Sequence, residues 1–321
     1  MKLQSISSTK EIFNNYGATF GFFVAIVFFS IVGKGFWSQQ NLENIIIQST
    51  SLGICAFGLT LVLLMGDIDL SYAGVVGLVG ALLAGWLKEG HSLVQATLLC
   101  MSVGLVTGLI NAALIVFLRL PSFLVTVAVM FLCMGAERVY NQGITTWITN
   151  NSALTLIRGH IGPVPAPIVY MFAVFLICWF LQTQTRWGHY IRGLGENINA
   201  ITEVGIRARM LKTLVYVIAG ILFAFGGYLE TLRNSGAVMY AGKQLMLSVL
   251  TACFLGTASF KAGKYNFPGT LLGAFFLYTL MSGFTALGLK FYLIPVAQGL
   301  ILIAAVAISS VRREKIEQVQ F

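Results

Sequence analysis

The chain has 321 residues, of which 57% are hydrophobic and only 10% are charged, and its mean hydropathy is +0.85. A water-soluble domain carries about a quarter charged residues, so this composition excludes a soluble globular protein and predicts a polytopic membrane protein. The net charge of +9 does not indicate nucleic-acid binding, because the basic residues are scattered through the loops. The cysteines are isolated in apolar runs and the histidines lie far apart, so neither a disulfide framework nor a metal site is expected.

The predicted elements are membrane-spanning helices, because about 20 apolar residues cross a bilayer. Residues 1–15 are polar and lack a small-residue cleavage site, which predicts a retained cytoplasmic tail. The apolar runs that follow predict spans at 16–32, 44–65, 71–87, 92–117, 121–136, 165–183, 211–230, 246–258, 267–289 and 292–311. The fold class is therefore all-α, with one transmembrane helix bundle over 16–311 and a cytoplasmic tail over 312–321.

Ten crossings place both termini on the same side of the membrane. Cytoplasmic termini put thirteen lysines and arginines inside and seven outside, in agreement with the positive-inside rule. Two runs, 121–136 and 246–258, are short for a full crossing, so each is either a span or a re-entrant segment.

Two carboxylates and a hydroxyl interrupt the apolar sequence in the segment GDIDLS, residues 66–71. An ionised carboxylate costs a few kcal/mol inside a bilayer, about 3 on insertion scales. One interpretation places Asp67 and Asp69 at the water boundary, with Asp69 or Ser71 capping the next helix. The alternatives are a place in a translocation path, a contact with a cytoplasmic motor, or a proton relay.

Small and polar residues inside the spans suggest a closely packed bundle. The glycines at 104, 108, 220, 226 and 227 let helix backbones approach each other. The polar residues within spans are candidates for the wall of a solute pathway, or they bond across helices or back to the backbone. These residues are Thr107, Asn111, Thr126, Ser282 and Thr285.

Two loops are long enough to receive a partner. The external loop 137–164 carries Tyr140, Trp147 and several amides, and is either a docking surface or a solvated loop with interfacial aromatic residues. In the cytoplasmic loop 184–212, apolar residues recur at spacings of three and four between Gly195 and Gly205. That spacing predicts a short helix, with Asn197 as its cap, which is either a docking helix or part of a solvated loop.

Four segments, in order along the chain, carry a family resemblance. GDIDLS at 66–71 is similar to a GGIDLS signature, with Asp67 in place of the second glycine. The segment 193–212 is similar to GxNxxAAxxxGI followed by a lysine, 255–274 to LGGxSxxGGxGxxxGTxxGA, and 282–289 to NNGLNLLGV. Together they resemble the permease subunits of ribose-type ATP-binding-cassette importers.

The resemblance implies a transport subunit of the bacterial cytoplasmic (inner) membrane with several partners. These are cytoplasmic ATP-hydrolysing subunits, a substrate-binding protein, and a second permease subunit that is identical or a paralogue. The residues implied to couple to the ATPase are Gly195, Glu196, Asn197, Ala200, Gly205 and Ile206. The solute would be a sugar or a similar small polar molecule, and permeases for branched-chain amino acids or nucleosides are the related alternatives.

The chain carries no motif for chemistry of its own. Its glycine-lysine pairs lack the spacing of a phosphate-binding loop, and neither GxSxG nor HExxH occurs. We therefore expect no catalytic residues and no cofactor, with ATP bound by the partner subunits. An ion-coupled secondary transporter would need buried acids at matching positions in two halves, and the acids at 67 and 69 lie only in the first half. A membrane scaffold would not need the helix in 184–212.

Overall fold

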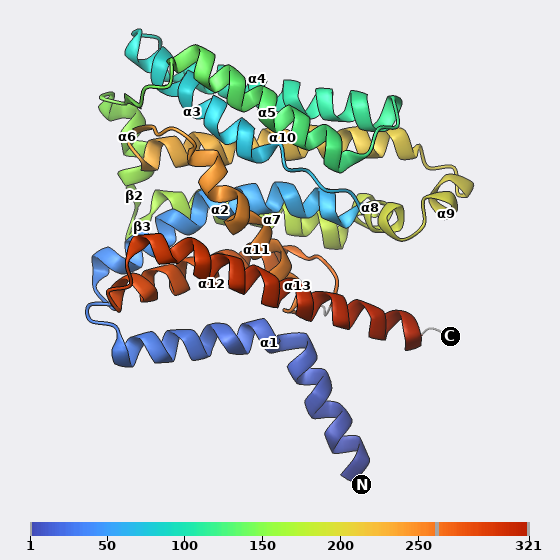
Figure 1. Ribbon diagram of the computed structural model, residues 1–321. Helices are drawn as coiled ribbons and strands as arrows, with labels where there is room; N and C mark the ends of the chain where they lie inside the picture. The colour runs from blue at the N-terminus through green and yellow to red at the C-terminus, as the bar shows by residue number, and fades with distance from the viewer. Residues whose placement is uncertain (1, 261–262, 320–321) are drawn as a thin grey trace. The chain divides into compact units, whose positions relative to one another are not determined.

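The computed structural model describes residues 2–260 and 263–319, which are mainly helical (Figure 1). The helices are α1 (Lys2–Val32), α2 (Gln39–Leu64), α3 (Tyr72–Lys88), α4 (Leu93–Ala112), α5 (Ser122–Asn141), α6 (Asn151–Arg158), α7 (Ala166–Gln184), α8 (Arg186–Glu196), α9 (Ile198–Glu203), α10 (Ala208–Arg233), α11 (Ala241–Thr257), α12 (Phe267–Ala286) and α13 (Ile294–Val319). The π-helical turn η1 (Ala113–Phe117) continues α4, and the 3-10 turn η2 (Phe291–Leu293) precedes α13.

The strands among the described residues are two residues long and form two small antiparallel pairs. Strand β1 (Thr146–Trp147) pairs with β4 (Gly236–Ala237), and β2 (His160–Ile161) pairs with β3 (Val164–Pro165). The prediction of an all-α helical bundle is thereby confirmed at the level of fold class.

Most of the predicted spans coincide with a helix. Within the described residues, six helices are long and apolar enough to cross a membrane, namely α2, α4 with η1, α5, α7, α10 and α12. Three further apolar stretches are shorter, Tyr16–Val32, Tyr72–Lys88 and Ile294–Ala307. The count of ten spans and the cytoplasmic termini stay predictions.

Helix α5 differs from its predicted span because it continues past residue 136 to Asn141. The charged pair at the predicted boundary does not end the helix. Glu137 is buried, and Arg138 donates a hydrogen bond to the Tyr240 hydroxyl. Helix α5 is therefore 20 residues long, which is enough for a crossing, and the loop predicted from residue 137 begins later.

The chain forms two compact units. Unit 1 consists of the described residues within 1–49 and 247–321, and unit 2 consists of residues 50–246. The boundaries fall inside α2 and α11. The prediction of a single domain over 16–311 stays a prediction.

Unit 1 is packed through small residues and one asparagine. Gly256 and Gly269 face each other so closely that a Cβ on Gly269 would lie 2.2 Å from the Gly256 carbonyl oxygen. Asn266 caps α12 by accepting a 2.7 Å hydrogen bond from the Gly269 N–H, and its amide donates to the Gly256 and Ser259 carbonyls. Phe29 of α1 lies against Gly283 of α12. The glycines of segment 255–274 thus serve close helix packing.

Unit 2 is organised around α10, which meets three helices at backbone distance. A Cβ on Gly104 would lie 2.4 Å from the Gly220 carbonyl oxygen, and one on Gly220 would lie 2.2 Å from the Gly104 carbonyl oxygen. Further along α10, Gly226 faces Cys55 of α2 and Gly227 faces Val76 of α3. The predicted close approach at these glycines is confirmed.

We predict that Gly220→Ala destabilises the protein, because a methyl group has no room between α4 and α10. Overpacking of this kind costs about 1–3 kcal/mol. The matched control is Gly135→Ala in α5, where no atom lies within 4 Å of the added Cβ and where alanine favours the helix by about 1 kcal/mol. Thermal unfolding in detergent should show a lower midpoint for Gly220→Ala only; equal midpoints for the two variants would contradict the packing account.

Candidate functional site

The loop between α2 and α3 begins with a tight turn at Gly66. Gly66 has a φ of +84°, which glycine adopts without strain. Its N–H donates to the Leu63 carbonyl, and the Asp67 N–H donates to the Val62 carbonyl. This is the Schellman arrangement that ends a helix, and it turns the two acids away from the axis of α2.

Asp67 is held by the first turns of α10. Its Oδ2 accepts a hydrogen bond of 3.1 Å from the Lys212 Nζ and another of 3.1 Å from the Tyr216 hydroxyl. The side chains of Lys212 and Asp67 are 20% and 18% exposed. The carboxylate is therefore neutralised within the chain, in a partly desolvated environment where an ion pair is stronger than at an open surface.

Asp69 is held by α3 and α4. Its Oδ1 accepts from the Ser71 N–H at 2.9 Å and from the Ser71 hydroxyl at 2.6 Å, and its Oδ2 accepts from the Asn111 Nδ2 at 3.2 Å. The Asn111 Nδ2 also donates to the Ser71 Oγ at 3.0 Å. Burial raises the pKa of the Asp69 carboxyl to about 6, although the bonds from Ser71 and Asn111 favour its charged form.

Of the two residues considered as caps for the next helix, Ser71 does not make the capping bond. The Ser71 side chain makes no capping bond to α3, because its backbone has helical angles (φ −61°, ψ −23°) rather than the extended angles of a capping residue, and its hydroxyl donates to Asp69 instead. Asp69 instead accepts the N–H of the residue that precedes α3, which brings its negative charge to the positive end of that helix.

The predicted coupling loop forms a hairpin of two helices, α8 and α9. Figure 1 shows them at the end of unit 2 where α2 ends and α10 begins. Asn197 caps α9, since its Oδ1 accepts from the Asn199 and Ala200 N–H groups at 3.0 and 3.2 Å. Gly205, with a φ of +80°, follows α9. The predicted helix, its cap and its flanking glycines are confirmed; α8 was not predicted.

The hairpin touches the loop that carries the acids. A Cβ on Gly195 would lie 2.5 Å from the Leu64 carbonyl oxygen and 3.2 Å from the Gly66 nitrogen. On the other side, no residue of α9 is buried; Ile198 is 44% exposed, and Val204, which follows the helix as its C-cap, is 69% exposed. Glu196, Asn197 and Ala200 are also exposed, and Ile206 is half-buried. One face of the hairpin is thus packed and the other is open.

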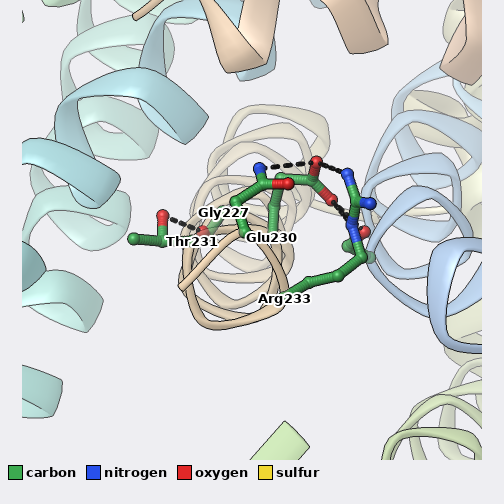
Figure 2. Close-up of polar contacts among 6 residues, drawn as sticks. Gly227, Glu230, Thr231 and Arg233 are labelled. Carbon is green, nitrogen blue, oxygen red and sulfur yellow. Dashed lines mark hydrogen bonds and ion pairs between the residues drawn. The ribbon is translucent and has the colours of Figure 1, made fainter. Parts of the chain in front are cut away.

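A second polar cluster, which the sequence analysis missed, surrounds Glu230 near the end of α10 (Figure 2). Glu230 is buried and accepts hydrogen bonds from the Ser51 hydroxyl at 2.5 Å, the Asn234 Nδ2 at 3.2 Å and the Arg233 guanidinium. The neighbouring Thr231 hydroxyl donates to the Gly227 carbonyl at 2.8 Å. The sequence feature that could have revealed this cluster is an acid three residues before an arginine, next to an apolar run. An acid in such a position needs a partner.

The similarity to known proteins extends over the helices described above. The model of the family described as branched-chain amino acid transport system / permease component matches residues 41–309. The chain belongs to this permease family. The ribose import permease protein RbsC of Bacillus subtilis (strain 168) is 32% identical to the permease over 292 residues, covering 90% of this chain and 91% of that protein.

Other relatives cover the permease to a similar extent. The ribose import permease protein RbsC of Escherichia coli (strain K12) is 32% identical over 291 residues, which is 89% of this chain and 91% of that protein. The L-arabinose ABC transporter permease protein AraH of Azospirillum brasilense is 26% identical over 305 residues, covering 95% and 90% of the two chains. No solved structure matches the permease.

The polar residues predicted as pathway candidates in the permease all have bonding partners. Asn111 bonds to Asp69, and Thr107 donates to the Val103 carbonyl of its own helix. Ser282 of α12 donates to Asn41 at 2.7 Å, and Thr285 donates to the Met281 carbonyl at 2.9 Å. Thr126 of α5 makes a long bond of 3.5 Å to the Ile68 carbonyl. These contacts agree with the structural alternative, and a pathway role for these residues stays a prediction.

The predicted external loop of the permease is folded rather than open. It contains α6, whose cap Asn150 accepts from the Ala153 N–H at 3.1 Å, and strand β1 ties it to β4. Tyr140 packs against Gly85 of α3, and Trp147 is 62% exposed. Docking of a partner on this segment stays a prediction.

We predict that Asp69→Ala lowers the free energy of unfolding of the permease by about 1–3 kcal/mol, because the buried Ser71 and Asn111 donors lose their acceptor. Thermal unfolding in detergent measures the change. Glu203→Ala, in exposed α9, is the control and should leave the midpoint unchanged. An unchanged midpoint for Asp69→Ala would contradict the assignment of Asp69 as the buried acceptor.

Proposed function

We propose that the chain is the membrane permease subunit of an ATP-binding-cassette importer that moves a sugar inward. The observation that carries the proposal is the α8–α9 hairpin, which packs Gly195 against the α2–α3 loop and exposes Ile198 and Val204 on its other side. Exposed aliphatic side chains on a short, capped helix fit the groove of a partner protein. The sugar class is supported by the names of the ribose and arabinose permeases that span the chain.

The transport cycle divides the work among several proteins. Two cytoplasmic subunits bind and hydrolyse ATP, and their closure moves the α8–α9 hairpin. A binding protein delivers the solute to the segment 137–164 on the outer side, and a second permease subunit completes the pathway. This chain takes no cofactor, crosses the bacterial inner membrane ten times and keeps both termini in the cytoplasm.

Ion coupling is less well supported by the geometry. A secondary transporter would use Asp67 and Asp69 as ion ligands. Asp67 is already neutralised by Lys212, and Asp69 accepts three hydrogen bonds from Ser71 and Asn111. Both acids are therefore engaged within the fold.

We predict that Ile198→Asp combined with Val204→Asp abolishes the retention of a co-expressed cytoplasmic ATPase subunit by the purified chain. Two charges in a desolvated contact cost more than 2 kcal/mol, which lowers the affinity by at least about 30-fold. The matched control is Ile161→Asp in β2, which is 53% exposed and lies at the other end of unit 2 (Figure 1). Pull-down followed by quantification of both proteins gives the amount of ATPase subunit retained per molecule of the chain.

Equal retention by both variants would overturn the docking role of α9. If the unaltered chain retained no ATPase and moved solute along an ion gradient by itself, the importer class would be wrong. The solute class is tested separately in proteoliposomes with the ATPase and a binding protein: ATP-dependent uptake of labelled ribose supports the sugar class, whereas uptake of labelled leucine in its place would contradict it.

A further inference from the structure

The beginning of α10 is mechanically continuous with the α8–α9 hairpin. Only residues 204–207 separate α9 from α10, and the Ile206 carbonyl accepts from the Ala208 N–H at 2.9 Å. The Ile206 N–H in turn donates to the Ile201 carbonyl of α9 at 3.2 Å. A displacement of α9 therefore acts on the first turns of α10, where Lys212 and Tyr216 lie.

The α2–α3 loop meets this moving segment through two kinds of contact. The first is the backbone contact between Gly66 and Gly195, which is steric. Repulsion between closed shells resists compression but offers almost no resistance to separation, because dispersion between a few atoms is worth only about 0.1–0.2 kcal/mol a pair. Through this contact alone the hairpin can push the loop away from itself but cannot pull it back.

The second contact is the ion pair of Asp67 with Lys212, supported by the Tyr216 hydroxyl. A charge-assisted hydrogen bond resists separation as well as compression. Its side chains are four-fifths buried, so water screens the attraction less than at an open surface. The loop also bonds to α5, where the Ile68 N–H donates to the Ser122 Oγ and the Thr126 hydroxyl donates to the Ile68 carbonyl, but both bonds are long at 3.5 Å and uncharged.

The two acids of the loop thus face different parts of the fold. Asp69 binds Ser71 and Asn111, which fixes the loop to α3 and α4. Asp67 binds residues of α10 that directly follow the hairpin. Of the two acids, Asp67 is the one whose side chain bonds the loop to the segment that a docked partner would move.

We propose that the Asp67–Lys212 ion pair makes the α2–α3 loop follow the α8–α9 hairpin in both directions of the transport cycle. Asp67 and Lys212 are then positioning residues, since they act through the loop rather than on the solute. The inference rests on the proposed function, because it needs an ATPase that moves the hairpin. It predicts that loss of the pair leaves ATP hydrolysis intact but uncouples it from transport.

The test compares Asp67→Asn, Lys212→Met and the double variant in the reconstituted complex of permease, ATPase and binding protein. The number of labelled ribose molecules taken up per ATP hydrolysed should fall at least about fivefold in each, while the ATPase rate stays within about twofold. The uptake per ATP should fall no further in the double variant than in either single variant, because the two residues form one ion pair. Lys212→Arg should retain coupling, and Lys88→Met, at an exposed lysine of α3, is the control.

A second readout does not depend on the identity of the solute. Hydrogen–deuterium exchange of the backbone over 62–72 is measured before and after a non-hydrolysable ATP analogue is added to the complex. On addition of the analogue, the exchange rate should change at least about threefold in the unaltered protein and in Lys212→Arg. It should not change in Lys212→Met or Asp67→Asn.

Three outcomes would overturn the proposal. The first is a response of the loop that persists in Lys212→Met and Asp67→Asn. The second is a parallel loss of ATPase rate, uptake and thermal stability, which would show a purely structural pair. The third is an additive loss in the double variant. Failure of the unaltered complex to hydrolyse ATP would refute the proposed function itself and is recognised without any variant.

Discussion

The backbone contact between α4 and α10 at Gly104 and Gly220 is the constraint on which unit 2 depends. Because no side chain separates these helices, α10 also comes within reach of α2 and α3 through Gly226 and Gly227. Both polar clusters involve α10. Near the beginning of α10, Lys212 and Tyr216 bond to the α2–α3 loop, and near the end of α10, Glu230 bonds to Ser51. A wider separation of α4 and α10 would disturb both clusters.

The bonding of the acids in unit 2 reflects the high free-energy cost of an unpartnered charge in an apolar helix bundle. A buried ion that loses its partner costs several kcal/mol, about 3–5, so the acids at 67, 69 and 230 each have donors arranged around them. Asp67 takes a cation and a hydroxyl, Asp69 takes two neutral side chains and a backbone N–H, and Glu230 takes an arginine, an amide and a hydroxyl. The acids at 67 and 69 therefore have a structural role, and any effect that they have on transport is exerted through these bonds.

Sequence reasoning was accurate where the signal is local. Apolar runs, the Asn197 cap and the close-packing glycines depend on neighbours within a few positions, and the structure confirms them. It named no partner where the partner is distant in the chain: Lys212 is 145 residues from Asp67, and Ser51 is 179 residues from Glu230. Of the two capping candidates, Ser71 makes no capping bond, because its hydroxyl is engaged by a local partner, Asp69, and by a distant one, Asn111, 40 residues away.

Site-specific cross-linking from α9 shows directly whether the hairpin docks a cytoplasmic ATPase subunit. The described cysteines are all buried, so a photoactivatable probe on Ala200→Cys, in exposed α9, labels the hairpin selectively. In membranes that contain the cytoplasmic ATPase subunit, we expect a cross-link to that subunit from residue 200 and none from the same probe on Ile161→Cys. A cross-link from residue 161 alone, or none from residue 200 in a complex that hydrolyses ATP, would contradict the docking role of the hairpin.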